Sequence, residues 1–96
     1  MMVLITYDVD TTDAEGKRRL RTVARKCVAH GQRVQNSVFE CIVDAAQYRK
    51  LQAELKAIVN PERDSLRFYM LGNRYESRVE HFGAKASYAP EGNLIL

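Results

Sequence analysis

The first hydrophobic run of the chain has the pattern of a β-strand that is buried on both faces. Residues 3–7 are mostly β-branched or aromatic, and apolar side chains stand at both odd and even positions. Thr12, with Glu15 three residues later, fits the capping box that begins a helix, and Gly31 is expected to end that helix. Between these limits apolar residues recur at helical spacing. They are Leu20, Val23, Ala24, Cys27 and Val28.

The rest of the chain continues the alternation of strand and helix patterns. Residues 33–43 are strand-like but are interrupted at Asn36-Ser37, which predicts two short strands that meet there at a tight turn or a bulge. Asp44 can cap a second helix over residues 45–59. Residues 64–71 alternate apolar and polar side chains, as expected for a further strand.

The predicted order is therefore βαββαβ, the ferredoxin-like α+β arrangement of a four-stranded antiparallel sheet with two helices on one face. A first strand that is apolar on both sides needs a cover on the other face as well. A second copy would supply it, as a two-fold homodimer with the sheets facing each other. We expect residues 1–71 to form the ferredoxin-like domain. Residues 72–96 are expected to form a C-terminal strand and tail, with an extra strand over Ser77–Phe82 that contacts the partner subunit or a different protein.

Length and composition support a single globular domain without a membrane segment. The chain has 96 residues, of which 46% are hydrophobic and 28% charged, which excludes disorder. Its longest apolar run, residues 1–5, is far shorter than the ~20 residues of a membrane span and is also too short for a signal peptide. A cytoplasmic location without a membrane partner is expected. Cys27 and Cys41 lack a zinc-binding spacing, and we expect both to be reduced core residues.

The net charge of +3 hides a strongly basic segment. Residues 17–33 contain seven basic residues and no acidic ones, so this segment carries +7 and the rest of the chain −4. Arg18, Arg21 and Arg25 fall on one face of the predicted helix. Such a cluster suggests an anionic partner, nucleic acid first of all, although a solvated helix face is an equally good interpretation on charge alone.

Candidate chemistry is concentrated around the end of the first strand. No common single-chain enzyme motif is present. Asp8 is unusual at the carboxyl end of a central strand, and in a dimer two copies of it could share a hard divalent cation such as Mg²⁺. The alternative is that Asp8 only begins a turn with Asp10. Ser37 could offer a hydroxyl and a backbone N–H to a phosphate, whereas Phe39 is interpreted as a core residue rather than a base-stacking platform.

Four segments in this order and at these separations resemble the CRISPR-associated endonuclease family. That family is the smaller of the two proteins found in nearly all CRISPR spacer-acquisition machineries. The resemblance extends from Met2 to about Ala86, and it includes features of the form that accompanies the type I-C system. The four segments are Leu4-Ile5-Thr6-Tyr7-Asp8, Arg18 to Arg21, Gly31 to Glu40, and Asp64 to Tyr69.

The resemblance implies a ferredoxin-like homodimer with Asp8 at the interface. In the family this carboxylate binds one Mg²⁺ or Mn²⁺ ion per dimer, shared between the two copies of Asp8. Activity has been linked to residues that here correspond to Tyr7, Ser37 and Phe39, which are the catalytic candidates together with Asp8. The nucleic-acid-binding candidates are Arg18, Arg19, Arg21, Arg25 and Arg33. The family cleaves single-stranded RNA or double-stranded DNA, and it also bridges the integrase subunits and holds the protospacer duplex.

We therefore predict a weak Mg²⁺-dependent endonuclease that acts on double-stranded DNA or single-stranded RNA. The activity should be weak because a single ion on a two-fold axis, without a nearby histidine base, is a modest catalyst. The alternative is a non-catalytic, DNA-binding scaffold of the integration complex. A ligand-sensing domain of the same fold is a third hypothesis, and the +7 segment argues against it.

Overall fold

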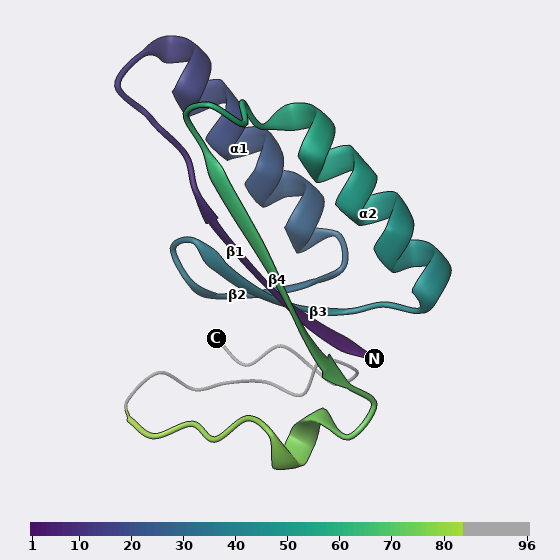
Figure 1. The fold of residues 1–96 in the computed structure, drawn as a ribbon. Helices are drawn as coiled ribbons and strands as arrows, with labels where there is room; N and C mark the ends of the chain where they lie inside the picture. The colour runs from purple at the N-terminus through teal and green to yellow at the C-terminus, as the bar shows by residue number, and fades with distance from the viewer. Residues whose placement is uncertain (84–96) are drawn as a thin grey trace.

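The computed structural model describes residues 1–83 and has the predicted βαββαβ order, with all four strands antiparallel to their neighbours (Figure 1). The strand order across the sheet is β2-β3-β1-β4, and the two helices lie together against one side of it. This is the ferredoxin-like fold expected from the sequence. The elements are β1 (Met2–Asp8), α1 (Ala14–Val28), β2 (Gly31–Gln35), β3 (Val38–Ile42), α2 (Ala45–Ile58), β4 (Ser65–Gly72) and a 3₁₀ helix (Tyr75–Ser77).

Strand β1 lies inside the sheet and divides its side chains between two surfaces. Val3, Ile5 and Tyr7 point toward the helices and are at most 4% exposed. The alternate residues of β1, with their neighbours on β3 and β4, form the surface opposite the helices, here called the open face. On this face β1 pairs with β4 in a fixed register. The pairs are Leu4 with Tyr69, Thr6 with Arg67 and Asp8 with Ser65.

The core lies between the sheet and the helices and confirms the predicted helical periodicity. Val23, Ala24 and Cys27 of α1 are buried there, and Leu20 is partly buried. Val28 is the exception to the predicted stripe, because it ends α1 and is 57% exposed. Both cysteines are free and buried, as expected. The core also takes in Phe39 and Cys41 of β3 and Leu51 and Leu55 of α2.

Only one of the two predicted N-caps is correct. Asp44 caps α2 in a complete capping box with Gln47: the Asp44 carboxylate accepts from the Gln47 backbone N–H at 2.7 Å. For α1 the predicted cap Thr12 is wrong. The cap is Asp13, whose carboxylate accepts from the backbone N–H of Gly16 at 2.8 Å. The Thr12 hydroxyl instead donates to Asp10 at 2.7 Å, so it is already engaged in the preceding turn.

Gly31 does not end α1 in the predicted way. The helix stops at Val28, and Gly31 is the first residue of β2, where it does not adopt a positive φ. A Cβ atom at this position would lie 1.9 Å from the backbone oxygen of Glu40 on β3. Glycine is therefore required because the two strands approach each other closely, and not because the helix needs a left-handed cap.

The extra strand predicted over Ser77–Phe82 is expected to pair with a partner subunit or a different protein, so for the single chain it stays a prediction. The 3₁₀ helix ends at Ser77, and residues 78–83 have no regular secondary structure. Backbone that does not pair with the chain's own sheet cannot form a strand without a partner. Residues 84–96 lie outside the described part. No helix within residues 1–83 is long and apolar enough to cross a membrane.

Candidate functional site

Asp8 is the most accessible carboxylate of the predicted site. It is the last residue of β1, its side chain is exposed on the open face, and it pairs with Ser65 on β4. Within residues 1–83 this carboxylate makes no hydrogen bond or ion pair. It borders a hollow of about 320 Å³. The residues that line the hollow are Thr6, Tyr7, Asp8, Ser65, Arg67 and Tyr69.

The turn that follows β1 is held by Asp10 and not by Asp8. The Asp10 carboxylate accepts from the Thr12 backbone N–H at 3.0 Å and from the Thr12 hydroxyl at 2.7 Å. The alternative in which Asp8 serves only to begin the turn therefore has no support in these contacts. Asp8 is free for a ligand, as a metal-binding carboxylate must be.

Tyr7 lies on the other side of the strand from Asp8 and is 4% exposed. Its ring stacks on Phe39 with 6.0 Å between centroids, and its hydroxyl donates to the backbone oxygen of Asn36 at 3.1 Å. Its backbone N–H donates to the backbone oxygen of Ser37 at 3.1 Å. Tyr7 thus fixes the β2–β3 turn to the end of β1, so that the exposed Ser37 lies at the same end of the sheet as Asp8.

Phe39 is completely buried, as the core interpretation predicted. The guanidinium of Arg33 lies 5.2 Å from the centroid of its ring, a cation–π contact between β2 and β3. Burial raises the pKa of Tyr7, and the nearby Arg33 charge opposes this shift. The rings of Tyr7 and Phe39 are buried on the helix side of the sheet, away from the open face. The structure gives both a packing role, and the catalytic role expected from the resemblance stays a prediction.

The arginines of α1 fall into two groups. Arg18, Arg21 and Arg25 are exposed on the helix layer, and of these only Arg18 has an acidic partner within residues 1–83, Glu15 at 2.8 Å. Arg19 differs: its Nε donates to Oδ2 of Asp64 at 2.7 Å, and its side chain is only 15% exposed. Its guanidinium is therefore engaged by a buried carboxylate, and its contact with nucleic acid stays a prediction.

Helix α1 lies against one side of the sheet (Figure 1), and the alternation of side chains along β1 places Asp8 on the other side. The structure therefore brings Asp8, Tyr7 and Ser37 together but keeps them apart from the exposed arginines of α1. Two separate surfaces result. One is an acidic position on the open face, and the other is a basic helix layer.

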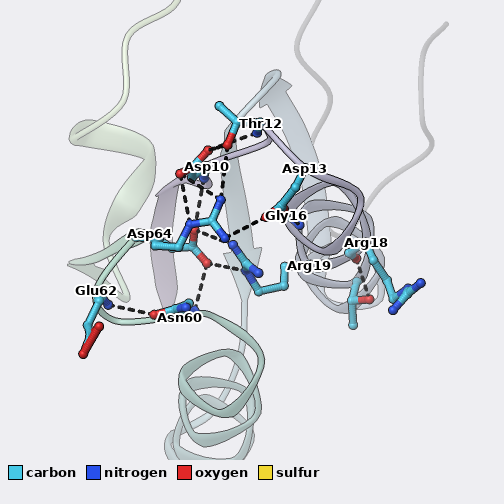
Figure 2. Close-up of polar contacts among 11 residues, drawn as sticks. Asp10, Thr12, Asp13, Gly16, Arg18, Arg19, Asn60, Glu62 and Asp64 are labelled. Atoms are coloured by element: carbon cyan, nitrogen blue, oxygen red, sulfur yellow. Dashed lines mark hydrogen bonds and ion pairs between the residues drawn. The ribbon is translucent and has the colours of Figure 1, made fainter.

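A network of ion pairs that the sequence analysis missed lies beside Asp8, and Figure 2 shows its contacts around Asp64. We call it the Asp64 clasp; it consists of Asp10, Asp13, Arg19, Arg63 and Asp64. The Asp64 side chain is 0% exposed and, besides Arg19, accepts from the backbone N–H of Asp10 at 3.0 Å and that of Asn60 at 2.8 Å. Arg63 donates to Asp10 at 3.0 Å and to Asp13 at 2.9 Å. The clasp ties the β1–α1 loop to the start of β4.

The clasp lowers the pKa values of its carboxylates. Burial alone would raise the pKa of Asp64, but the hydrogen bonds from Arg19 and two backbone N–H groups outweigh it, and the pKa is lowered. Hydrogen bonds from Thr12, with the help of Arg63, lower the pKa of Asp10 to about 2. The backbone N–H of Gly16, followed by Arg63, lowers the pKa of Asp13. The arginine and the aspartate of each ion pair are more than forty residues apart in sequence, so no local pattern predicts these pairs.

The donor atoms around Asp8 fit a partly hydrated Mg²⁺ or Mn²⁺ ion. The Asp8 carboxylate and the Ser65 hydroxyl are hard oxygen donors, which these cations prefer, and Mg²⁺ is held by one or two carboxylates and keeps several waters. Within residues 1–83, however, no group of three or more His, Cys, Asp or Glu side chains could hold a metal ion. One chain therefore supplies a single carboxylate, and a further one would have to come from a second copy.

Comparisons with known proteins give a family and a common fold. The family model described as CRISPR associated protein Cas2 matches residues 1–79. The CRISPR-associated endonuclease Cas2 of Halalkalibacterium halodurans is 57% identical over 96 residues, with all of both chains covered. The CRISPR-associated endoribonuclease Cas2 of Nitratidesulfovibrio vulgaris is 55% identical and covers 100% of this chain and 94% of its own. The crystal structure of Streptococcus pyogenes Cas2 at pH 6.5 superposes with a TM-score of 0.76 and 52% identity, over 86% of this chain and 100% of that chain.

Proposed function

This chain belongs to the CRISPR-associated Cas2 family, and on that basis we propose that it is a metal-dependent endonuclease that works as a two-fold homodimer in CRISPR spacer acquisition. One observation carries the proposal: Asp8 presents an exposed carboxylate, without a partner in residues 1–83, at the end of a central strand. Relatives named endonuclease and endoribonuclease support the reaction class. The substrate is then a phosphodiester of double-stranded DNA or single-stranded RNA.

Two copies of Asp8 would hold one Mg²⁺ or Mn²⁺ ion per dimer. When bound, such an ion polarises a phosphoryl oxygen and makes a coordinated water more acidic. The chain itself positions Asp8 on a strand rather than on a loop, and the Asp64 clasp fixes the backbone that follows it. Tyr7 holds the β2–β3 turn, which keeps Ser37 at the same end of the sheet.

The open face supports the proposed dimer. Leu4, Val38 and Ile42 lie on this face and are only half-buried in a single chain. A sheet face that carries aliphatic side chains gains free energy when it is covered, and a second copy related by a two-fold axis would also bring a second Asp8 to the site. In such a dimer the helix layers are outermost.

The outer helix layer would hold the duplex. Arg18, Arg21 and Arg25 are exposed there, and Arg33 is exposed on the edge strand β2. Arginines of this kind bind phosphates without reading sequence. In the spacer-acquisition complex the dimer would bridge integrase subunits while these arginines hold the protospacer DNA.

The test of the nuclease function is the substitution Asp8→Asn. It removes the charge and keeps the size, so we expect metal-dependent cleavage to be lost while the circular-dichroism spectrum and the dimer mass remain those of the wild type. Asp44→Asn is the matched control, because Asp44 caps α2 away from the open face and asparagine caps equally well. Cleavage of labelled RNA and duplex DNA is measured with Mg²⁺, with Mn²⁺ and with EDTA. Cleavage by Asp8→Asn at the wild-type rate would remove Asp8 from the mechanism.

A second candidate function is a non-catalytic DNA-binding scaffold. It is favoured by Arg21 and Arg25, which are exposed on α1 and have no acidic partner within residues 1–83. Helix α1 covers the side of the sheet opposite the open face (Figure 1). Free cations of this kind suit phosphate binding whether or not the open face cleaves anything.

The double substitution of Arg21 and Arg25 by glutamine tests this surface. We expect weaker duplex binding and a decrease of about 2 in the slope of log affinity against log salt, one for each lost phosphate contact. Fluorescence anisotropy at several salt concentrations measures it. If spacer integration needs these arginines but is unchanged in Asp8→Asn, the scaffold is the function; an unchanged salt slope would argue against the helix layer as the DNA surface.

A further inference from the structure

Arg67 is a charged residue of the hollow to which neither the sequence analysis nor the ion pairs of the fold give a role. It lies on β4 opposite Thr6, two residues from Ser65, which is itself opposite Asp8. Diagonal neighbours of this kind on adjacent strands have Cα atoms about 7–8 Å apart, within reach of a long side chain. Arg67 and Asp8 both line the hollow.

The guanidinium of Arg67 is oriented but not neutralised. Its Nη1 donates to the hydroxyl of Tyr69 at 3.2 Å, and the side chain is otherwise exposed. Within residues 1–83, no carboxylate lies at ion-pair distance from it. Arg19 and Arg63 differ in this respect, because both are engaged by carboxylates of the Asp64 clasp.

We propose that Arg67 binds the non-bridging oxygens of the phosphodiester next to Asp8, and that Tyr69 is a positioning residue that orients its guanidinium. The proposal rests on the nuclease function proposed above and names the group that receives the phosphate. A guanidinium offers paired N–H donors that match phosphate oxygens, which an ammonium group does not. Both residues lie on a strand, so little reorganisation is needed when the ligand binds.

The negative charge that develops during hydrolysis explains how Arg67 would accelerate the reaction. A water oxygen bonds to phosphorus, the bond from phosphorus to one ester oxygen breaks, that oxygen takes up a proton and the attacking water releases one. Negative charge increases on the non-bridging oxygens during this step, and a fixed cation beside them stabilises the transition state more than the bound substrate. Asp8 cannot supply this stabilisation because it is itself negative.

The experiment compares Arg67→Gln with Arg49→Gln, which removes the same charge from an exposed position on α2. Two quantities are measured: the single-turnover cleavage rate at saturating protein with Mn²⁺, and the affinity for the same unmodified oligonucleotide in EDTA, which removes the metal that cleavage requires. We expect Arg67→Gln to cleave about 100-fold more slowly than the wild type while its affinity stays within about 3-fold of that of Arg49→Gln. Arg49→Gln should cleave at the wild-type rate.

Two further variants separate positioning from charge. Arg67→Lys keeps the charge but loses the paired donors, so its rate should lie between those of wild type and Arg67→Gln. Tyr69→Phe removes only the hydroxyl that orients the guanidinium, and its rate should fall by less than that of Arg67→Gln, with unchanged oligonucleotide affinity.

Each failure has its own signature. If the wild type and Arg49→Gln cleave and Arg67→Gln cleaves equally fast, the inference about Arg67 is wrong and the nuclease function stands. If scattering shows that Arg67→Gln is a monomer, Arg67 serves the subunit interface and the inference is overturned. If the wild type itself does not cleave in Mg²⁺ or Mn²⁺, the proposed nuclease function fails and the inference fails with it.

Discussion

Two groups of charged side chains lie at the same end of β1, and they differ in how their charges are paired. In the Asp64 clasp, Asp10, Asp13 and Asp64 each accept hydrogen bonds from arginine and from backbone N–H groups. In the hollow, Asp8 and Arg67 have no partner of opposite charge within residues 1–83. The residue types are the same, so the pairing decides which group stabilises the fold and which remains available to a ligand.

The difference follows from solvation. The Asp64 side chain is 0% exposed, and a carboxylate without water is tolerated only when cations and N–H groups replace its hydration. Asp8 is exposed and keeps its water. An approaching cation can displace that water at little cost to the fold. The comparison therefore predicts that substitutions in the clasp affect stability and substitutions in the hollow affect chemistry.

The largest expected effect on stability is that of Asp64→Asn. The substitution leaves Arg19, whose side chain is 15% exposed, without its carboxylate. Removing one partner of a buried pair costs about 3 kcal/mol of unfolding free energy. Urea denaturation followed by circular dichroism measures it. Asp8→Asn is the matched control, since it makes the same chemical change on the open face, and its urea midpoint should equal that of the wild type.

Two results would contradict the assignment of stability to the clasp and of chemistry to the hollow. If Asp64→Asn unfolds at the wild-type urea concentration, the clasp does not stabilise the fold. If Asp8→Asn is the destabilised variant, Asp8 has a structural partner that the single chain does not provide. Cleavage gives a second reading: Asp64→Asn should keep metal-dependent activity under conditions where it is folded, although the loop after Asp8 is then less firmly held.

The fold could be predicted from the sequence because each element has a local signature. The alternation of the strands and the helical spacing of Val23, Ala24 and Cys27 depend only on which side chains the core buries. The failures are also local in origin. Thr12 and Asp13 are both good caps, and only the contact of Thr12 with Asp10 decides between them. The role of Gly31 depends on how closely β3 approaches it, which no local pattern records.

The site could be predicted only in part. An aspartate is unusual at the end of a central strand, which predicts a role for Asp8; its exposure is observed and its role stays a prediction. The burial of Phe39 confirms the interpretation of this residue as part of the core. Arg19 could not be distinguished from its neighbours Arg18 and Arg21, because the carboxylate that engages it lies 45 residues away in sequence. The extra strand over Ser77–Phe82 stays a prediction, because residues 78–83 have no regular secondary structure in the single chain and the strand was expected to pair with a partner.

Acid provides a finer test of the clasp than removal of Asp64. The pKa of Asp10 is lowered to about 2, and the pKa values of Asp13 and Asp64 are also below their ordinary values. A carboxylate whose pKa is lower in the folded state contributes stability that is fully present above its unfolded pKa of about 4. That contribution is lost as the pH falls through the folded pKa, because protonation then favours the unfolded chain. The urea midpoint of the wild type should therefore fall between pH 4 and pH 2.

Asp10→Asn and Arg63→Gln make this acid dependence specific to the clasp. Asp10→Asn has no carboxylate to protonate, so its midpoint should be lower than that of the wild type at pH 7 and the two should converge as the pH approaches 2. Arg63→Gln removes a guanidinium that helps to lower the pKa values of Asp10 and Asp13. We expect it to lower the urea midpoint at pH 7 as well, by less than Asp10→Asn does. These contacts are on the surface and screened by solvent, so both effects should be smaller than that of Asp64→Asn. If the difference in urea midpoint between the wild type and Asp10→Asn stays constant from pH 7 to pH 2, the charge of Asp10 does not stabilise the fold. The contrast between paired and unpaired carboxylates would then depend on Asp64 alone.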